Sequence, residues 1–150
     1  MRGDSFFLDT NILVYSFDAA TPARHDKAQA LIAQALETDN GCISYQVVQE
    51  FLNVAIRKFP APMPPATVRR YLAGVLMPLC RVFANGALYE RALDVLERWR
   101  YAWYDALIIA SALEAGCAVL YSEDLQDGQV IESLTIRNPF QPQRERKRRR

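Results

Sequence analysis

Short apolar runs alternate along the chain with longer segments of helical periodicity, and this alternation is the strongest constraint on its fold. The apolar runs predict buried strands at residues 5–8, 41–44, 79–83 and 118–121. Segments with apolar residues every three or four positions predict helices at residues 23–36, 46–59, 66–77, 88–99 and 103–115. Alternating strands and helices are typical of an α/β fold, in which a mostly parallel sheet is covered by helices on both faces.

Two of the predicted helices differ in their polarity. In the helix at 46–59 one face is apolar, and Glu50 lies on the opposite, polar face. The helix that starts at Trp103 has almost no polar side, so we expect it to be buried, with Asp105 in its first turn. Gly116 follows it as the expected C-terminal cap. A further run at residues 133–136 predicts one last edge strand.

The charge distribution divides the chain into two parts. The formal net charge is only +1, yet residues 144–150 contain six basic residues and one Glu. We therefore expect one globular domain at residues 1–140 and a basic, disordered tail at residues 141–150. Such a tail attracts phosphate groups, although a purely solubilising role explains the same composition.

Cellular location and cysteine chemistry follow from simple absences in the sequence. No run of about 18 apolar residues is long enough to span a bilayer, and the first residues lack the apolar core of a signal peptide, so we expect a cytoplasmic protein with no membrane partner. Cys42, Cys80 and Cys117 are odd in number and lie far apart in apolar runs. We interpret them as reduced core thiols, not as a disulfide framework or a zinc site.

Acidic residues occur where predicted strands give way to loops or helices. Asp9 ends the first strand, Glu50 follows the second within two turns, and Asp124 follows the strand that ends at Tyr121. Asp105 joins them from the start of the buried helix. Because the carboxyl ends of parallel strands meet at one crevice, these acids should converge there. Clustered carboxylates repel one another, so the cluster predicts a neutralising Mg²⁺ or Mn²⁺, hard ions that prefer oxygen ligands.

Such an ion activates a water molecule for attack on a phosphodiester and stabilises the leaving oxygen, so no histidine is required. The chain has a single histidine, His25, which excludes a ribonuclease that uses two histidines as acid and base. Serine and cysteine triads fail for the same lack of a base. No phosphate-binding glycine loop is present either, so neither an ATPase nor a dinucleotide enzyme is indicated.

Four short motifs resemble those of PIN domains, especially the VapC-type toxins. They are Leu-Asp-Thr-Asn-Ile-Leu at 8–13, Gln-Val-Val-Gln-Glu-Phe at 46–51, Trp-Tyr-Asp-Ala-Leu-Ile at 103–108 and Tyr-Ser-Glu-Asp at 121–124. Any one of them is a weak signal. Their order and spacing agree with the family from Phe6 to about Phe140, and the ordered set is specific.

The resemblance implies a three-layer α/β/α PIN-like domain that cleaves RNA endonucleolytically with Mg²⁺ or Mn²⁺. Asp9 and Asp105 would bind the metal directly, and Glu50 and Asp124 would complete the site through water or a second ion. Asn11 and Ser122 would orient carboxylates by hydrogen bonds. The resemblance also implies the toxin of a type II toxin–antitoxin system, silenced by a small antitoxin protein and assembled as a homodimer.

Each acid also has a simpler interpretation when it is taken alone. Asp9 and Asp105 are good helix N-caps, and Glu50 suits a solvated helix face. Glu123 and Asp127 are interpreted as surface loop residues beside Asp124. The run of aromatic and basic residues at 98–104 suits stacking on RNA bases, core packing, a dimer contact or an antitoxin surface, and the sequence does not separate these.

Two rival functions share part of this pattern. A phosphatase of the haloacid dehalogenase type also begins with an Asp after its first strand, but it needs a second Asp where this chain has Asn11. A non-catalytic PIN-like RNA-binding or adaptor module is the alternative of a different class. Clustered acids argue against it, because carboxylates facing a polyanion weaken binding unless a cation is present.

Overall fold

Six strands form one sheet in the computed structural model, which describes residues 4–141. The strands lie in the order β3-β2-β1-β4-β6-β5, and only β5 runs antiparallel to its neighbour. Their bounds are β1 Phe6–Leu8, β2 Gly41–Ser44, β3 Cys80–Val82, β4 Val119–Tyr121, β5 Val130–Ile131 and β6 Leu134–Arg137. The central strand is therefore β1, with β2 and β4 on either side.

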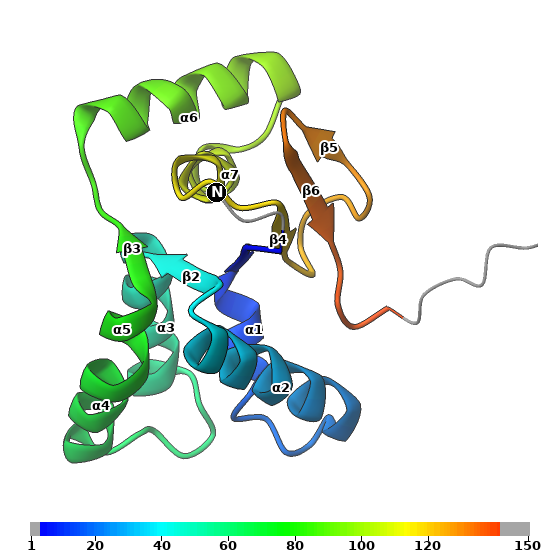
Figure 1. Ribbon diagram of the computed structural model, residues 1–150. Helices are drawn as coiled ribbons and strands as arrows, with labels where there is room; N and C mark the ends of the chain where they lie inside the picture. Colours follow the sequence, from blue (N-terminus) through cyan, green and yellow to red (C-terminus); the bar gives the residue numbers. More distant parts are fainter. Residues whose placement is uncertain (1–3, 142–150) are drawn as a thin grey trace, which may run out of the picture.

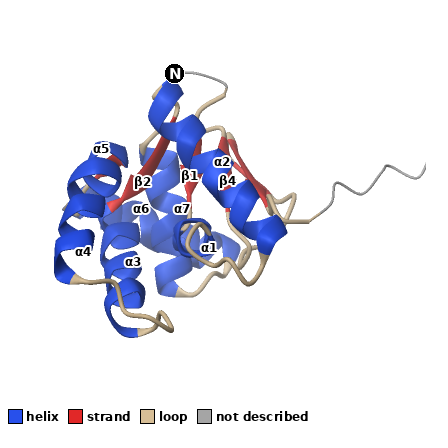
Figure 2. Ribbon diagram, turned by 90° about the horizontal axis from the view of Figure 1, so that it is seen from below, coloured by secondary structure: helices blue, strands red, loops and turns tan. Residues whose placement is uncertain are grey.

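Helices cover both faces of this sheet. Their bounds are α1 Thr10–Tyr15, α2 Pro22–Thr38, α3 Tyr45–Arg57, α4 Pro65–Tyr71, the π-helical turn η1 Leu72–Leu76, α5 Met77–Leu79, α6 Gly86–Trp99 and α7 Trp103–Glu114. In Figure 1, α6 and α7 lie above the strands and α1 to α5 lie below them. Figure 2, seen from below, shows the second group in front of the strands and α6 and α7 behind them. The predicted three-layer α/β/α fold with a mostly parallel sheet is confirmed.

Burial explains why these segments take these positions. All three residues of β1 are buried, and every residue from Ala106 to Leu113 on α7 is buried, as its all-round apolar sequence predicts. Gly41 lets β2 approach its neighbours closely. A Cβ atom there would lie 2.4 Å from the Cβ of Ala35 and 2.6 Å from the ring of Phe6, so alanine would push apart a packed core.

The structure corrects three details of the sequence-based assignment. The predicted edge strand at 133–136 is β6, which lies between β4 and β5. The edge strand on this side of the sheet is β5, which has two residues and is too short to produce a pattern. The short helix α1 directly after Asp9 was not assigned, and the predicted helix at 66–77 contains the π-helical turn η1. The predicted cap is confirmed: Gly116 follows α7 with a φ of 73°.

Other expectations concern the cysteines, membranes and the tail. Cys42, Cys80 and Cys117 are buried free thiols, as predicted. Within residues 4–141, no helix has both the length and the apolar character needed to cross a membrane. The predicted basic tail lies outside the described residues except for Gln141.

Candidate active site

The four predicted acids come from separate segments that meet at the carboxyl ends of the central strands. Asp9 directly follows β1, and Asp124 lies three residues after the end of the neighbouring β4. Glu50 lies in the second turn of α3, which begins directly after β2, and Asp105 lies in the first turn of α7. The fold thus gathers residues that are up to 115 positions apart in the sequence.

Asp9 is held on both carboxylate oxygens. Its Oδ1 accepts a hydrogen bond from the Thr10 backbone N–H at 2.7 Å, and its Oδ2 accepts one from the Ser122 hydroxyl at 2.7 Å. Its role as the N-cap of α1 is therefore real, but capping occupies only one of the two oxygens. Asp9 is 8% exposed, and this burial raises its pKa from 3.8 to about 6, with Glu50 and Asp124 adding repulsion.

Glu50 is not the solvated surface residue that its helix position alone suggests. Its Oε1 accepts a hydrogen bond from the Thr10 hydroxyl at 2.6 Å, and its Oε2 accepts one from Gln46 Nε2 at 3.3 Å. The same amide of Gln46 also donates to the carbonyl of Tyr104 at 3.2 Å, at the start of α7. Gln46 thereby ties the α3 acid to the helix that carries Asp105.

Asp124 lies at the exposed rim and is positioned by two polar neighbours. Asn11 Nδ2 donates a hydrogen bond to Asp124 Oδ2 at 3.0 Å, and the Asp124 backbone N–H donates to Ser122 Oγ at 3.2 Å. Ser122 therefore bridges the Asp9 carboxylate and the backbone of the Asp124 loop. The Oδ1 atom of Asn11 is buried and has no hydrogen-bond partner among residues 4–141, so it is an unpaired acceptor beside Asp124.

Asp105 differs from the other acids because nothing within residues 4–141 donates a hydrogen bond to its side chain. The alternative that it caps α7 is wrong: the N-cap is Ala102, and Asp105 lies inside the first turn. Partial burial raises the pKa of Asp105, and the charges of Asp124 and Glu50 raise it further. The carboxylate is thus available for an external partner.

These pKa shifts connect the four acids electrostatically, because Glu50 and Asp124 raise the pKa of both Asp9 and Asp105. Among residues 4–141, however, no three His, Cys, Asp or Glu side chains lie close enough together to hold one metal ion directly. The donors are carboxylate oxygens, the type that Mg²⁺ and Mn²⁺ prefer. The residues therefore fit a hard cation that keeps several of its own water molecules, and do not fit a cage closed by protein ligands.

Three contributors to the site were not assigned from the sequence. Thr10 stands beside Asp9 in the first motif and Gln46 precedes Glu50 by one helical turn, so both could have been found from their spacing. Glu123 was interpreted as a surface loop residue, but Tyr15 donates a hydrogen bond to it at 2.7 Å and Arg24 forms an ion pair with it at 3.0 Å. No local pattern predicts that contact between α1, α2 and the loop after β4.

The aromatic and basic run at 98–104 divides between the core and the surface. Trp99 and Tyr101 pack against the main core, and Trp103 packs against the second cluster and lies 6.2 Å from the ring of Tyr89. Core packing is thus the correct alternative for these three residues. Tyr104 is 67% exposed and remains available at the surface.

A PIN domain model matches residues 6–126, which is most of the chain. The chain belongs to the PIN-domain family. This result confirms the family inferred from the four motifs, and the match covers all four of the predicted acids. No curated protein matches the chain significantly.

Solved structures of toxins and toxin–antitoxin complexes share this fold. The Mycobacterium tuberculosis toxin VapC20, described as cleaving the sarcin–ricin loop, is 25% identical with a TM-score of 0.60, over 80% of this chain and 90% of that chain. A toxin–antitoxin complex from Klebsiella pneumoniae is 21% identical with a TM-score of 0.63, over 90% and 98%. VapBC2 from Rickettsia felis, bound to a promoter DNA fragment, is 18% identical with a TM-score of 0.57, over 89% and 97%. The family match and the VapC20 structure support a place for the chain in a toxin nuclease family, and the other two structures share its fold.

Proposed function

We propose that this PIN domain is a Mg²⁺- or Mn²⁺-dependent endoribonuclease that acts in the cytoplasm as the toxin of a type II toxin–antitoxin system. The observation that carries the proposal is the meeting of Asp9, Glu50, Asp105 and Asp124 at one end of the sheet, with hydrogen bonds to three of them. The pKa values of Asp9 and Asp105 are raised, so their ionised forms are unfavourable in the protein alone. Such shifts are typical of functional sites.

We assign the four acids the roles that membership of the PIN-domain family implies. Asp9 and Asp105 would bind the cation directly, and Glu50 and Asp124 would act through water or a second ion. When bound, the cation supplies charge stabilisation and an activated water for hydrolysis of the phosphodiester. Ser122 and Asn11 would hold the carboxylates of Asp9 and Asp124 in fixed orientations, as polar neighbours of metal ligands commonly do.

Purified protein and an end-labelled RNA test the proposal directly. Cleavage should require added Mg²⁺ or Mn²⁺, stop when a chelator is added, and produce internal cuts that an exonuclease cannot make. The VapC20 neighbour makes RNA that contains a sarcin–ricin loop a reasonable first substrate. RNA binding without cleavage across both metals and several RNAs would instead favour the non-catalytic adaptor.

The cellular part of the proposal includes a small antitoxin and a homodimer. Expression of the protein alone should stop growth, and co-expression with a small protein encoded beside it should restore growth. The toxin–antitoxin complexes among the structural neighbours support this expectation. Normal growth with abundant, active protein would contradict the toxin role while leaving the nuclease chemistry intact.

A further inference from the structure

A basic pocket lies beside the acidic site and has no part in the roles assigned so far. Its volume is about 910 Å³, and it lies between the first turns of α2 and the chain that leaves β6. The residues that line it are Ala23, Arg24, Lys27, Tyr121, Asp127, Arg137, Asn138, Pro139, Phe140 and Gln141. Figures 1 and 2 agree in placing the start of α2 next to the end of the described chain.

The pocket contains positive charge that the described protein does not neutralise. Arg24, Lys27 and Arg137 line it, with Asp127 as the one acidic lining residue. Arg24 is paired with Glu123, but no carboxylate within residues 4–141 forms an ion pair with Lys27 or Arg137. Both of these side chains are exposed. Two cations are thus available to an anion that enters from solvent.

The pocket and the acidic site share structural elements. Tyr121 of β4 pairs in register with Arg137 of β6, and the Ser122 backbone N–H donates to the Arg137 carbonyl at 3.0 Å. Ser122 in turn donates to Asp9. Arg24, on the pocket wall, forms an ion pair with Glu123, the residue before Asp124. The pocket therefore lies next to the acidic site, on the side of β6. An RNA strand bound at the acidic site would pass close to it.

We propose that this pocket binds a backbone phosphate of a single-stranded RNA substrate, outside the phosphodiester that is cut. The inference rests on the proposed nuclease function. Four carboxylates repel a polyanion, so a nearby pair of cations offsets that repulsion and fixes the direction in which the strand leaves the site. In sequence, Gln141, which lines the pocket, is followed by a segment with six basic residues at 144–150, and basic residues attract nucleic-acid phosphates.

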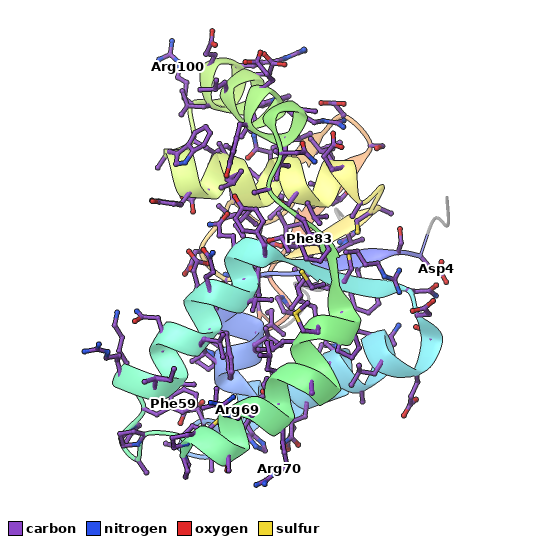
Figure 3. All side chains as sticks on the ribbon, turned by 90° about the vertical axis from the view of Figure 1, so that its left-hand side faces the viewer. Asp4, Phe59, Arg69, Arg70, Phe83 and Arg100 are labelled. Atoms are coloured by element: carbon purple, nitrogen blue, oxygen red, sulfur yellow. The ribbon has the colours of Figure 1, made fainter. Side chains whose placement is uncertain are left out.

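The test compares two double variants of the full chain that remove equal charge. Lys27→Gln/Arg137→Gln empties the pocket of its unpaired cations. Arg69→Gln/Arg70→Gln removes two exposed cations from α4, which Figure 1 places on the opposite side of the molecule from the end of the described chain and Figure 3 shows near Phe59. Binding of a fluorescent single-stranded RNA is measured in chelator across a range of salt concentrations, so that cleavage does not contribute.

The pocket variant should weaken RNA binding on the order of tenfold and reduce the salt slope by about 0.7 for each lost phosphate contact. The α4 variant should change neither quantity, and both variants should melt at the wild-type temperature. Equal weakening in both variants, or an unchanged slope in the pocket variant, overturns the proposal. Inorganic phosphate is titrated separately: if it binds only when Lys27 and Arg137 are present while RNA binding ignores them, the pocket is a free phosphate site and the RNA proposal is wrong.

Cleavage assays separate this proposal from the nuclease function itself. With Mg²⁺, the pocket variant should raise KM and leave kcat near the wild-type value, because the lost contact is equally present in the ground state and the transition state. If wild-type protein cuts no RNA yet the salt slope still depends on Lys27 and Arg137, the nuclease proposal fails and the phosphate site stands. If wild-type protein cuts RNA and the two variants bind RNA alike, the nuclease proposal stands and the phosphate site is wrong.

Discussion

Asp9 and Asp105 are the two proposed direct metal ligands, yet the protein surrounds them in opposite ways. Asp9 is buried at the carboxyl end of the central strand β1, and both of its oxygens accept hydrogen bonds, from Thr10 and Ser122. Asp105 is half-exposed at the start of α7 and accepts none from residues 4–141. The comparison indicates that the sheet supplies a fixed anchor at Asp9, whereas α7 supplies a carboxylate that can adjust to the cation and the substrate.

The largest expected effect comes from replacing Asp9 or Asp105 by Asn, which should lower cleavage while raising the stability of the metal-free protein. Asp9→Asn and Asp105→Asn should each lower RNA cleavage by about 100-fold or more, since loss of even a neighbour of a metal ligand costs 10–100-fold. In chelator, Asp9→Asn should raise the free energy of unfolding by about 2 kcal/mol at pH 7. A pKa of about 6 makes the ionised Asp9 less favourable than an uncharged side chain by about 3 kcal/mol, and this figure already includes its hydrogen bonds. Asparagine has one acceptor oxygen in place of two, so it keeps only one of the bonds from Thr10 and Ser122, and this loss removes about 1 kcal/mol of the gain.

Asp105→Asn should stabilise the metal-free protein less, because Asp105 is more exposed. Urea unfolding in chelator and in Mg²⁺, with cleavage measured on the same samples, checks both variants. Each should also lose the stabilisation that Mg²⁺ gives to the wild type. Destabilisation of metal-free Asp9→Asn would mean that its capping and hydrogen bonds outweigh the cost of its buried charge, and intact cleavage would remove Asp9 from the site.

The same contrast shows what the sequence could and could not predict. Asp9, Glu50 and Asp124 follow strands whose apolar runs are easily recognised. Their meeting at the carboxyl ends of these strands therefore followed from the parallel topology. The degree of burial of each acid did not follow, because it depends on how segments distant in the sequence pack together: Asp9 is buried, whereas Asp124 is exposed. The strand β5 and the basic pocket were missed for a similar reason, since each is built from contacts between distant segments.

The pH dependence of stability should identify Asp9 as the buried acid. Its pKa is raised in the folded protein, so its contribution to stability is fully present below pH 3.8 and is lost as pH rises through about 6. In chelator, the wild type should therefore gain about 2 kcal/mol relative to Asp9→Asn when the pH falls from 7 to 4. The difference between the two proteins is the quantity to measure, because acids elsewhere titrate equally in both. A difference that stays constant across this range would contradict the raised pKa.

The smallest expected effect concerns Thr10, which binds Asp9, the buried member of the comparison, and also Glu50. Its backbone N–H donates to Asp9, and its hydroxyl donates to Glu50 at 2.6 Å. Thr10→Val keeps the backbone bond and the side-chain shape but removes the hydroxyl, so Glu50 retains only the longer bond from Gln46. We expect a loss of about 1 kcal/mol in unfolding free energy and about a tenfold rise in the Mg²⁺ concentration that gives half-maximal cleavage. Thr10→Ser restores the hydroxyl and should recover the wild-type Mg²⁺ requirement. If Thr10 had only a structural role, Thr10→Val would lower stability without changing the Mg²⁺ requirement. If Thr10→Val and Thr10→Ser need the same Mg²⁺ concentration as the wild type, the hydroxyl does not position Glu50 for the cation, and Glu50 acts on the site through its charge alone.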